Sequence, residues 1–144
     1  MTWGLLTNLW RLSRGLREEI TPYLERLGLA PTDPWLLAEI ERHHYPTEAV
    51  RAMQMPAPTI SQMLKRLEQA GLVVRSLDPT DLRRYHFELT QDGQKVLEES
   101  RQHMLKALER RLERLSPTQR QQFAEWLEIL AQDEISTPKD KHPS

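Results

Sequence analysis

The pattern of apolar residues changes from helical to strand-like across Gly71, and no other feature constrains the fold as strongly. On the N-terminal side, apolar residues recur at helical spacing: Ile60, Met63, Leu64 and Leu67. This spacing predicts an amphipathic helix with one buried face, and Gly71 stands where a glycine commonly ends a helix. On the C-terminal side, Leu72–Val74 and Tyr85–Leu89 predict two strands joined by a turn around Asp78-Pro79.

Further helices are predicted on both sides of this segment. An apolar stripe from Leu5 to Leu27 predicts a long first helix. Asp33 followed by Pro34 predicts the N-cap and the first residue of a second helix, and a short third helix follows it. A long helix begins at Thr90, and the Ser-x-x-Gln spacing from Ser116 predicts a capped last helix.

The predicted order of elements is that of a winged helix-turn-helix domain: a short helix, a turn, an amphipathic helix and two strands with a charged connection. We therefore expect a mainly α fold with a small β-hairpin, the wing, and with long helices at both ends of the chain. An α-helix fits the major groove of duplex DNA, and a basic hairpin tip can lie along the phosphate backbone or enter a minor groove. Double-stranded DNA is therefore the first candidate partner.

The charge of the chain favours a small anion-binding surface. The formal net charge is −1, whereas nucleic-acid-binding domains are usually basic. Locally, Ser61–Arg84 holds five basic and three acidic residues, a surplus of two positive charges. A structural hairpin needs no arginine pair, so Arg83 and Arg84 indicate an anionic partner, while a solvated hairpin tip is the alternative.

Composition and motifs exclude several other functions. The chain has no cysteine, which removes disulfides, thiolate nucleophiles and thiolate metal sites. It lacks a glycine-rich phosphate loop and a nucleophile elbow, so we expect neither an enzyme nor a cofactor. No stretch is apolar enough to span a membrane and no signal peptide is evident, so a cytoplasmic protein without a membrane partner is the expectation.

The histidines do not form a metal-binding motif in the sequence. Glu99 and His103 share a helix face, and His43 and His44 adjoin a helix end, but adjacent residues do not face one site. We therefore expect no metal site, and we interpret these histidines as surface or interface residues.

The segment Ala49–Leu97 resembles the DNA-binding half of the MarR family of transcription regulators. The resemblance rests on four short motifs: Pro58-Thr59-Ile60-Ser61, Ala70-Gly71-Leu72-Val73, Asp81-Leu82-Arg83 and Leu89-Thr90-x-x-Gly93. The helices at both ends extend the resemblance to nearly the whole chain. The resemblance implies that the helix beginning near Pro58 is the recognition helix, which contacts DNA. One departure from the family pattern is Gln54, in the turn before this helix, where the family often has glycine.

The resemblance implies a repressor that binds a pseudo-palindromic operator as a homodimer. It divides residues 1–135 into an N-terminal dimerisation helix (1–30), a winged helix-turn-helix domain (31–90) and C-terminal dimerisation helices (91–135). The polar, proline- and lysine-rich composition from about Ser136 predicts a disordered tail (136–144). The DNA-binding residues that it implies are Pro58, Thr59, Ser61, Gln62, Lys65, Arg66, Arg75, Asp81, Arg83 and Arg84. Among them, Arg83 matches the arginine that enters the minor groove, and Asp81 matches the acid that holds the wing through a salt bridge.

The resemblance also allows a small-molecule effector between the dimerisation helices and the winged domain. Trp10, Trp35 and Tyr45 could line its pocket, whereas packing in the core or in the dimer is their other interpretation. The alternative function is a winged-helix module for protein-protein interaction that binds no DNA, which the near-neutral net charge favours.

Overall fold

The structure, a computed structural model, describes residues 1–132. Within them, six helices and a two-stranded antiparallel sheet follow one another: α1 (Thr2–Arg26), α2 (Asp33–His43), α3 (Pro46–Met53), α4 (Ala57–Gln69), β1 (Val73–Leu77), β2 (Tyr85–Leu89), α5 (Gln91–Leu112) and α6 (Pro117–Ala131). The expected mainly α fold with one hairpin is confirmed. The predicted disordered tail, 136–144, lies outside the described residues.

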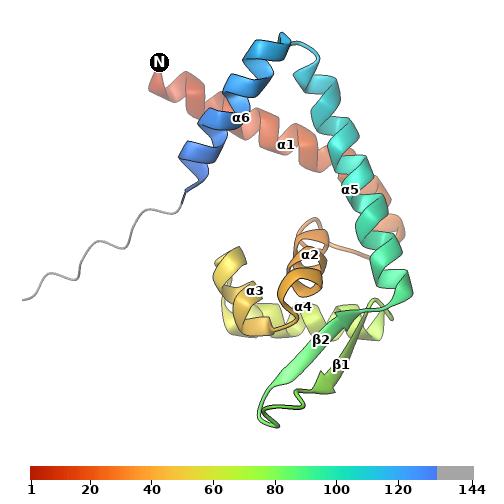
Figure 1. Cartoon of the computed structure of the whole chain (residues 1–144). Coiled ribbons are helices and arrows are strands. Elements are labelled where there is room, and N and C mark those ends of the chain that lie inside the picture. The colour runs from red at the N-terminus through yellow and green to blue at the C-terminus, as the bar shows by residue number, and fades with distance from the viewer. Residues whose placement is uncertain (133–144) are drawn as a thin grey trace, which may run out of the picture. The chain divides into compact units, whose positions relative to one another are not determined.

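The buried face of α4 forms the centre of the winged domain. Its four apolar residues are at most 7% exposed, and they pack with buried residues of α2, α3 and the hairpin. The hairpin extends beyond α2, α3 and α4, as Figure 1 shows. Because Ile60, Met63, Leu64 and Leu67 point inward, the polar side chains of α4 point toward solvent.

Glycine ends both α1 and α4 in the left-handed conformation. Gly28 has φ +70° and Gly71 has φ +75°. After α4, the Gly71 N–H donates to the Glu68 carbonyl and the Leu72 N–H donates to the Leu67 carbonyl, which closes a Schellman motif. The chain then turns directly into β1, as the change of apolar spacing predicts.

The hairpin is longer on its first strand than the sequence indicates. β1 was expected to end at Val74, but Arg75, Ser76 and Leu77 continue the pairing opposite Phe87, His86 and Tyr85. Only Val73 of β1 is buried, and the rest of the strand is exposed. A solvated strand needs few apolar residues, so the pattern of apolar residues did not reveal where β1 ends.

The start of α2 differs from the expectation for Asp33. Thr32 is the N-cap residue and makes no side-chain cap, whereas Asp33 is the first helical residue and is fully buried. The Asp33 carboxylate accepts the Ala30 N–H at 2.7 Å and the Arg66 guanidinium at 2.7 Å. Its charge is therefore used to join two helices rather than to cap one.

The chain divides into two compact units, Met1–Leu108 and Glu109–Ser144. In the second unit, Ser116 and Gln119 form the predicted capping box at the start of α6. No residue of α6 is buried, and four of its large apolar side chains are exposed: Trp126, Leu127, Ile129 and Leu130. Such side chains are typical of a surface that another chain covers.

Candidate nucleic-acid interface

The predicted contact positions on α4 form its solvent-facing side. Pro58, Ser61, Gln62, Lys65 and Arg66 are exposed, and Thr59 is half-buried. Hydroxyl, amide and ammonium groups of this kind are the donors and acceptors that read base edges and phosphates. The arrangement therefore brings together the side chains that the sequence predicted on this helix.

A groove of about 680 Å³ lies between α4 and the wing. Four cations line it, Lys65, Arg75, Arg83 and Arg84, against the one acidic residue Glu68. The groove is open at the surface and combines these charges with the hydroxyl of Ser61 and the amide of Gln62. A polyanion whose charges follow one another along a chain, such as a phosphodiester backbone, matches this lining.

Two of these arginines are held in place by aromatic rings. The guanidinium of Arg84 lies 4.0 Å from the centroid of the Tyr45 ring, and that of Arg75 lies 4.5 Å from the centroid of the Tyr85 ring. Arg75 Nε also lies 3.5 Å from Glu68 Oε2, a weak, partly exposed ion pair. Their positions are thus set before any ligand arrives.

Lys65 and Arg83 differ from these two arginines. Both are exposed, and neither makes an ion pair within residues 1–132. They can therefore meet an anion without breaking an ion pair of the described residues.

Asp78, rather than Asp81, holds the shape of the wing. Asp78 is 3% exposed, and it accepts hydrogen bonds from the Tyr45 hydroxyl at 2.7 Å, the Thr80 N–H at 2.8 Å and the Thr80 hydroxyl at 2.7 Å. These donors, the Tyr45 hydroxyl foremost, hold the pKa of Asp78 well below its ordinary value. The turn therefore depends on a carboxylate that stays ionised.

The salt bridge implied for Asp81 is not formed in this structure. Within the described residues, the Asp81 carboxylate accepts the backbone N–H of Arg83 at 3.0 Å and makes no ion pair, and the Asp81 carbonyl accepts the Arg84 N–H at 3.0 Å. The side chain of Arg83 is left to face solvent. The sequence pattern did not identify Asp78 as the buried carboxylate of this turn, because Tyr45, which donates to it, is distant in the sequence.

Arg66 has a structural partner that the sequence did not reveal. Its guanidinium binds the fully buried Asp33 carboxylate and is itself 46% exposed. Burial raises the pKa of Asp33, and the Ala30 N–H and the Arg66 charge oppose that rise only in part. The predicted DNA contact of Arg66 stays a prediction, but the ion pair gives it a different first role.

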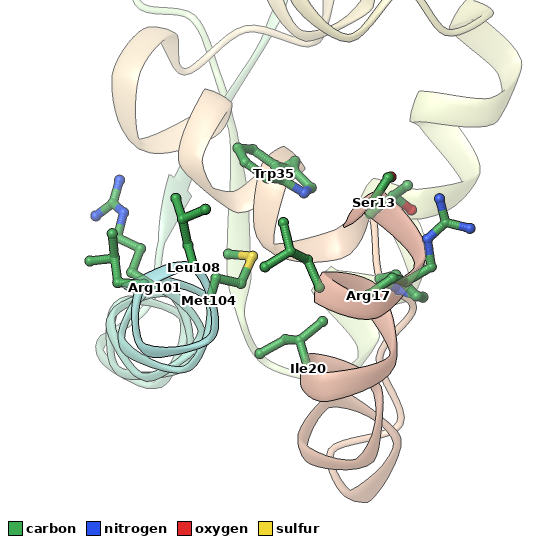
Figure 2. A pocket seen from close by; sticks show the side chains of 11 residues that line it. Ser13, Arg17, Ile20, Trp35, Arg101, Met104 and Leu108 are labelled. Atoms are coloured by element: carbon green, nitrogen blue, oxygen red, sulfur yellow. The ribbon is translucent and has the colours of Figure 1, made fainter. Parts of the chain in front are cut away.

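A second cavity, of about 870 Å³, lies among α1, α2 and α5 (Figure 2). Trp35 projects into it above Met104 and Leu108, with Ile20 on the opposite wall (Figure 2). Its size falls in the range of small-molecule sites. Of the three aromatic residues predicted for an effector pocket, only Trp35 lines this cavity.

The other two predicted pocket residues lie elsewhere. Tyr45 lines the groove beside the wing, where its hydroxyl binds Asp78. Trp10 is 60% exposed on α1, and the Arg14 guanidinium lies 5.1 Å from the centroid of its ring. Their aromatic character did not distinguish a pocket residue from a wing or surface residue.

The backbone geometry explains two sequence features noted above: the position of Gln54 before α4 and the Thr90-x-x-Gly93 motif at the start of α5. Gln54 adopts φ +51°, the left-handed conformation for which glycine is the usual choice. A Cβ at Gly93 would overlap the backbone carbonyl oxygen of Leu72. Thr90 joins the same region, because its hydroxyl donates to the Gly71 carbonyl at 2.6 Å and accepts the Gly93 N–H at 3.0 Å.

Comparison with known proteins identifies this arrangement. The family model described as the MarR family matches residues 27–84, from the end of α1 to the tip of the wing. These 58 residues, less than half of the chain, are similar to the MarR family. The resemblance stated from the sequence motifs is thereby confirmed.

Two curated relatives match part of the chain. The organic hydroperoxide resistance transcriptional regulator of Bacillus subtilis (strain 168) is 33% identical over 89 residues, which span 59% of this chain and 59% of that protein. The HTH-type transcriptional regulator FarR of Neisseria gonorrhoeae is 48% identical over 42 residues, 29% of each. The matched parts thus span less than two thirds of these two relatives. Their names are those of regulators, in agreement with the expectation that the chain is not an enzyme.

Solved MarR-family structures match over nearly the whole fold. The crystal structure of MarR has a TM-score of 0.74 at 25% identity and covers 88% of this chain and 94% of that chain. The crystal structure of the S. aureus MepR-DNA complex has a TM-score of 0.73 at 24% identity, with coverage of 87% and 96%. At 24% identity, the similarity to the MepR-DNA complex shows the fold alone.

Among residues 1–132, none of the helices has the length and apolar character that a membrane-spanning helix needs.

Proposed function

We propose that the chain is a sequence-specific DNA-binding transcriptional regulator that represses transcription as a homodimer on a pseudo-palindromic operator. The observation that carries this proposal is the groove between α4 and the wing, with four cations facing one acidic residue. Local charge at this surface outweighs the net charge of −1, which is spread over the whole chain.

Each side of the groove fits a different part of duplex DNA. The polar face of α4, with Ser61, Gln62 and Lys65, would enter the major groove and contact base edges. Arg83 at the wing tip would enter the neighbouring minor groove, where negative potential is enhanced if the groove is narrow. Arg75 and Arg84, already held by aromatic rings, would bind phosphates between the two.

Dimerisation is supported by exposed apolar residues near both ends of the described chain. The first ten residues of α1 expose Trp3, Leu5, Leu6, Leu9 and Trp10, and α6 exposes four more large apolar residues. Solvent-exposed tryptophan and leucine in such number favour burial against a second copy. Two winged domains would then bind two half-sites about 34 Å apart, one helical turn of DNA.

Relief by a small-molecule effector is the role we propose for the cavity among α1, α2 and α5. Its walls are mostly apolar, and the guanidinium groups of Arg17 and Arg101 lie at its edge. A ligand that binds one geometry of the dimer better than another shifts the population toward that geometry. A geometry with wrongly spaced α4 helices would release the operator.

The test is a fluorescence-anisotropy titration on an operator selected from random duplex DNA. We expect Arg83→Ala to lower operator affinity by about 1 to 3 kcal/mol, the usual scale for a specific contact. Arg114→Ala, which removes an exposed cation far along the chain from the groove, serves as the matched control and should leave affinity unchanged. Equal affinity of Arg83→Ala and the unmodified chain would refute the assignment of the wing.

Dimerisation has its own measurement. Sedimentation velocity at micromolar concentration should give a dimer, and Trp126→Glu should shift it toward monomer because the exposed apolar face of α6 then carries a charge. A monomeric unmodified chain would refute the role proposed for the terminal helices.

The alternative is a protein-protein interaction module, which the net charge of −1 favours. A titration with random duplex DNA at low salt separates the two functions, because electrostatic binding to DNA needs no specific sequence. A chain that binds no duplex under these conditions would refute the DNA-binding proposal and favour the interaction module.

A further inference from the structure

We propose that His44, His86 and Glu88 form a binding site for a divalent transition-metal ion of the Zn²⁺ type. One ligand atom from each residue lies within 4.8 Å of the others. His44 and His86 are half-buried and Glu88 is exposed. Two imidazoles and one carboxylate are a common ligand set for zinc, with a fourth position left for water or another ligand.

The fold brings these residues together from distant parts of the sequence. His86 and Glu88 are two apart on β2, so they share the face of the strand opposite the buried Phe87. His44 follows α2, and its carbonyl accepts the Phe87 N–H at 2.8 Å. This backbone hydrogen bond fixes the end of α2 against the middle of β2.

His44 is held in a conformation and a tautomer that suit metal binding. Its φ is +65°, a left-handed value that costs energy for any residue with a Cβ and that glycine usually adopts after a helix. Its Nδ1 lies 3.1 Å from the Phe87 carbonyl oxygen, which can only accept, so the tautomer that makes this hydrogen bond has its proton on Nδ1 and presents Nε2 to a ligand. Metal-binding histidines usually make this type of hydrogen bond with their second nitrogen.

The spacing of the three ligand atoms requires a small adjustment. Around a tetrahedral zinc ion with bonds of about 2.0 to 2.2 Å, ligand atoms lie roughly 3.4 Å apart. The rings of His44 and His86 have centroids 4.8 Å apart and planes inclined by 33°. Rotation of the His86 ring and of the exposed Glu88 side chain can bring the ligand atoms closer without moving the backbone.

The proposed ion would join α2 to β2, the strand that follows the wing. Tyr45, next to His44, contacts the His86 ring edge-on at a centroid distance of 5.6 Å and binds Asp78 in the turn of the wing. The metal site and the anchor of the wing therefore occupy adjacent residues. Metal binding itself does not depend on the proposed DNA-binding function, so either proposal can fail alone.

Isothermal titration calorimetry with ZnCl₂ tests the site on the full, chelator-treated chain near neutral pH. All proteins carry His142→Gln, because His142 lies outside the described residues and could bind zinc independently. We expect one zinc ion per chain. His86→Gln and Glu88→Gln should each lower zinc affinity by about tenfold or more, since even outer-shell changes cost about that much.

The matched control is His43→Gln, which removes the neighbouring exposed histidine that pairs with Glu39 at 3.9 Å. It should bind zinc as the parent does, and MgCl₂ should give no binding because imidazole is a poor ligand for magnesium. If His86→Gln unfolds by circular dichroism, the exposed Glu88→Gln decides the matter. A parent chain that binds no zinc, or a loss of affinity equal in His43→Gln and Glu88→Gln, would overturn the proposal.

Discussion

Replacing Arg66 with alanine should destabilise the fold, because it removes the partner of a buried carboxylate. Asp33 is fully buried, and its Oδ1 lies 2.7 Å from a guanidinium nitrogen of Arg66. After the replacement, the Ala30 N–H on Oδ2 is the remaining hydrogen-bond donor to Asp33 in the described part of the chain. A buried carboxylate with one lost partner raises the free energy of the folded state.

The expected loss follows from the exposure of the two side chains. A hydrogen bond to a charged group contributes about 1.5 to 3 kcal/mol, and loss of a partner in a fully buried ion pair costs about 3 to 5 kcal/mol. The Arg66 side chain is 46% exposed, so solvent screens the pair and water can approach Asp33 once the guanidinium is gone. We therefore expect Arg66→Ala to lower the free energy of unfolding by about 1 to 2 kcal/mol.

The assay is urea unfolding followed by circular dichroism at one fixed protein concentration, because dimerisation would make stability depend on concentration. Lys65→Ala is the matched control, since Lys65 adjoins Arg66 on α4, is exposed and makes no ion pair among residues 1–132. It should change stability by less than about 0.5 kcal/mol. A double-mutant cycle with Asp33→Asn isolates the interaction between the two side chains.

The pH dependence gives a second check on the same reasoning. Burial raises the pKa of Asp33, so this carboxyl gains a proton at a higher pH in the folded than in the unfolded chain. A neutral Asp33 needs Arg66 less, so the difference between the parent and Arg66→Ala should shrink as pH falls. Equal urea midpoints for the parent and Arg66→Ala near pH 7 would refute the structural role of the pair.

Two further replacements test the hairpin and its junction with α5. Gly93→Ala should lower the free energy of unfolding by about 1 to 3 kcal/mol in urea, because its Cβ would overlap the Leu72 carbonyl. Gly4→Ala, where an added Cβ meets nothing within 4 Å, should leave stability unchanged or raise it by up to about 1 kcal/mol. Because the folded pKa of Asp78 is depressed, its contribution to stability is present above the unfolded pKa of about 3.9 and is lost as pH falls below it. Asp78→Asn should therefore be less stable at neutral pH and show a flatter acid limb in thermal unfolding; an unchanged acid limb would contradict the role given to this carboxylate.

Much of the winged domain could be predicted because its signals are local in sequence. The helical spacing from Ile60 to Leu67 is set by packing on one face, and all four apolar residues are indeed buried. The left-handed conformation at Gly71 ends α4 and sets where β1 begins. The exposed polar residues of α4 follow from the same periodicity, since the side away from the core must face solvent.

The parts that could not be predicted depend on contacts between residues far apart in sequence. Asp33 has the local sequence pattern of an N-cap. Only the folded structure, which places the start of α2 beside α4, shows that the Asp33 carboxylate binds Arg66. Likewise Tyr45 looks like any aromatic residue near a helix end until β2 brings the wing beside it. The grouping of His44 with His86 and Glu88 has no signal in the sequence, because it depends on how β2 packs against the end of α2.

Both ends of α2 contact an element of the proposed DNA-binding surface. At its N-terminal end, Asp33 binds Arg66 of α4, and the flanking Thr32 and Trp35 line the cavity among α1, α2 and α5. At its C-terminal end, His44 binds the backbone of β2, and the next residue, Tyr45, binds the turn of the wing. A ligand in the cavity that favours a second position of α2 would therefore act on the recognition helix and on the wing through separate contacts. Coupling of this kind requires two discrete positions of one packed element, and α2 meets the structural requirement of touching the cavity, α4 and the hairpin.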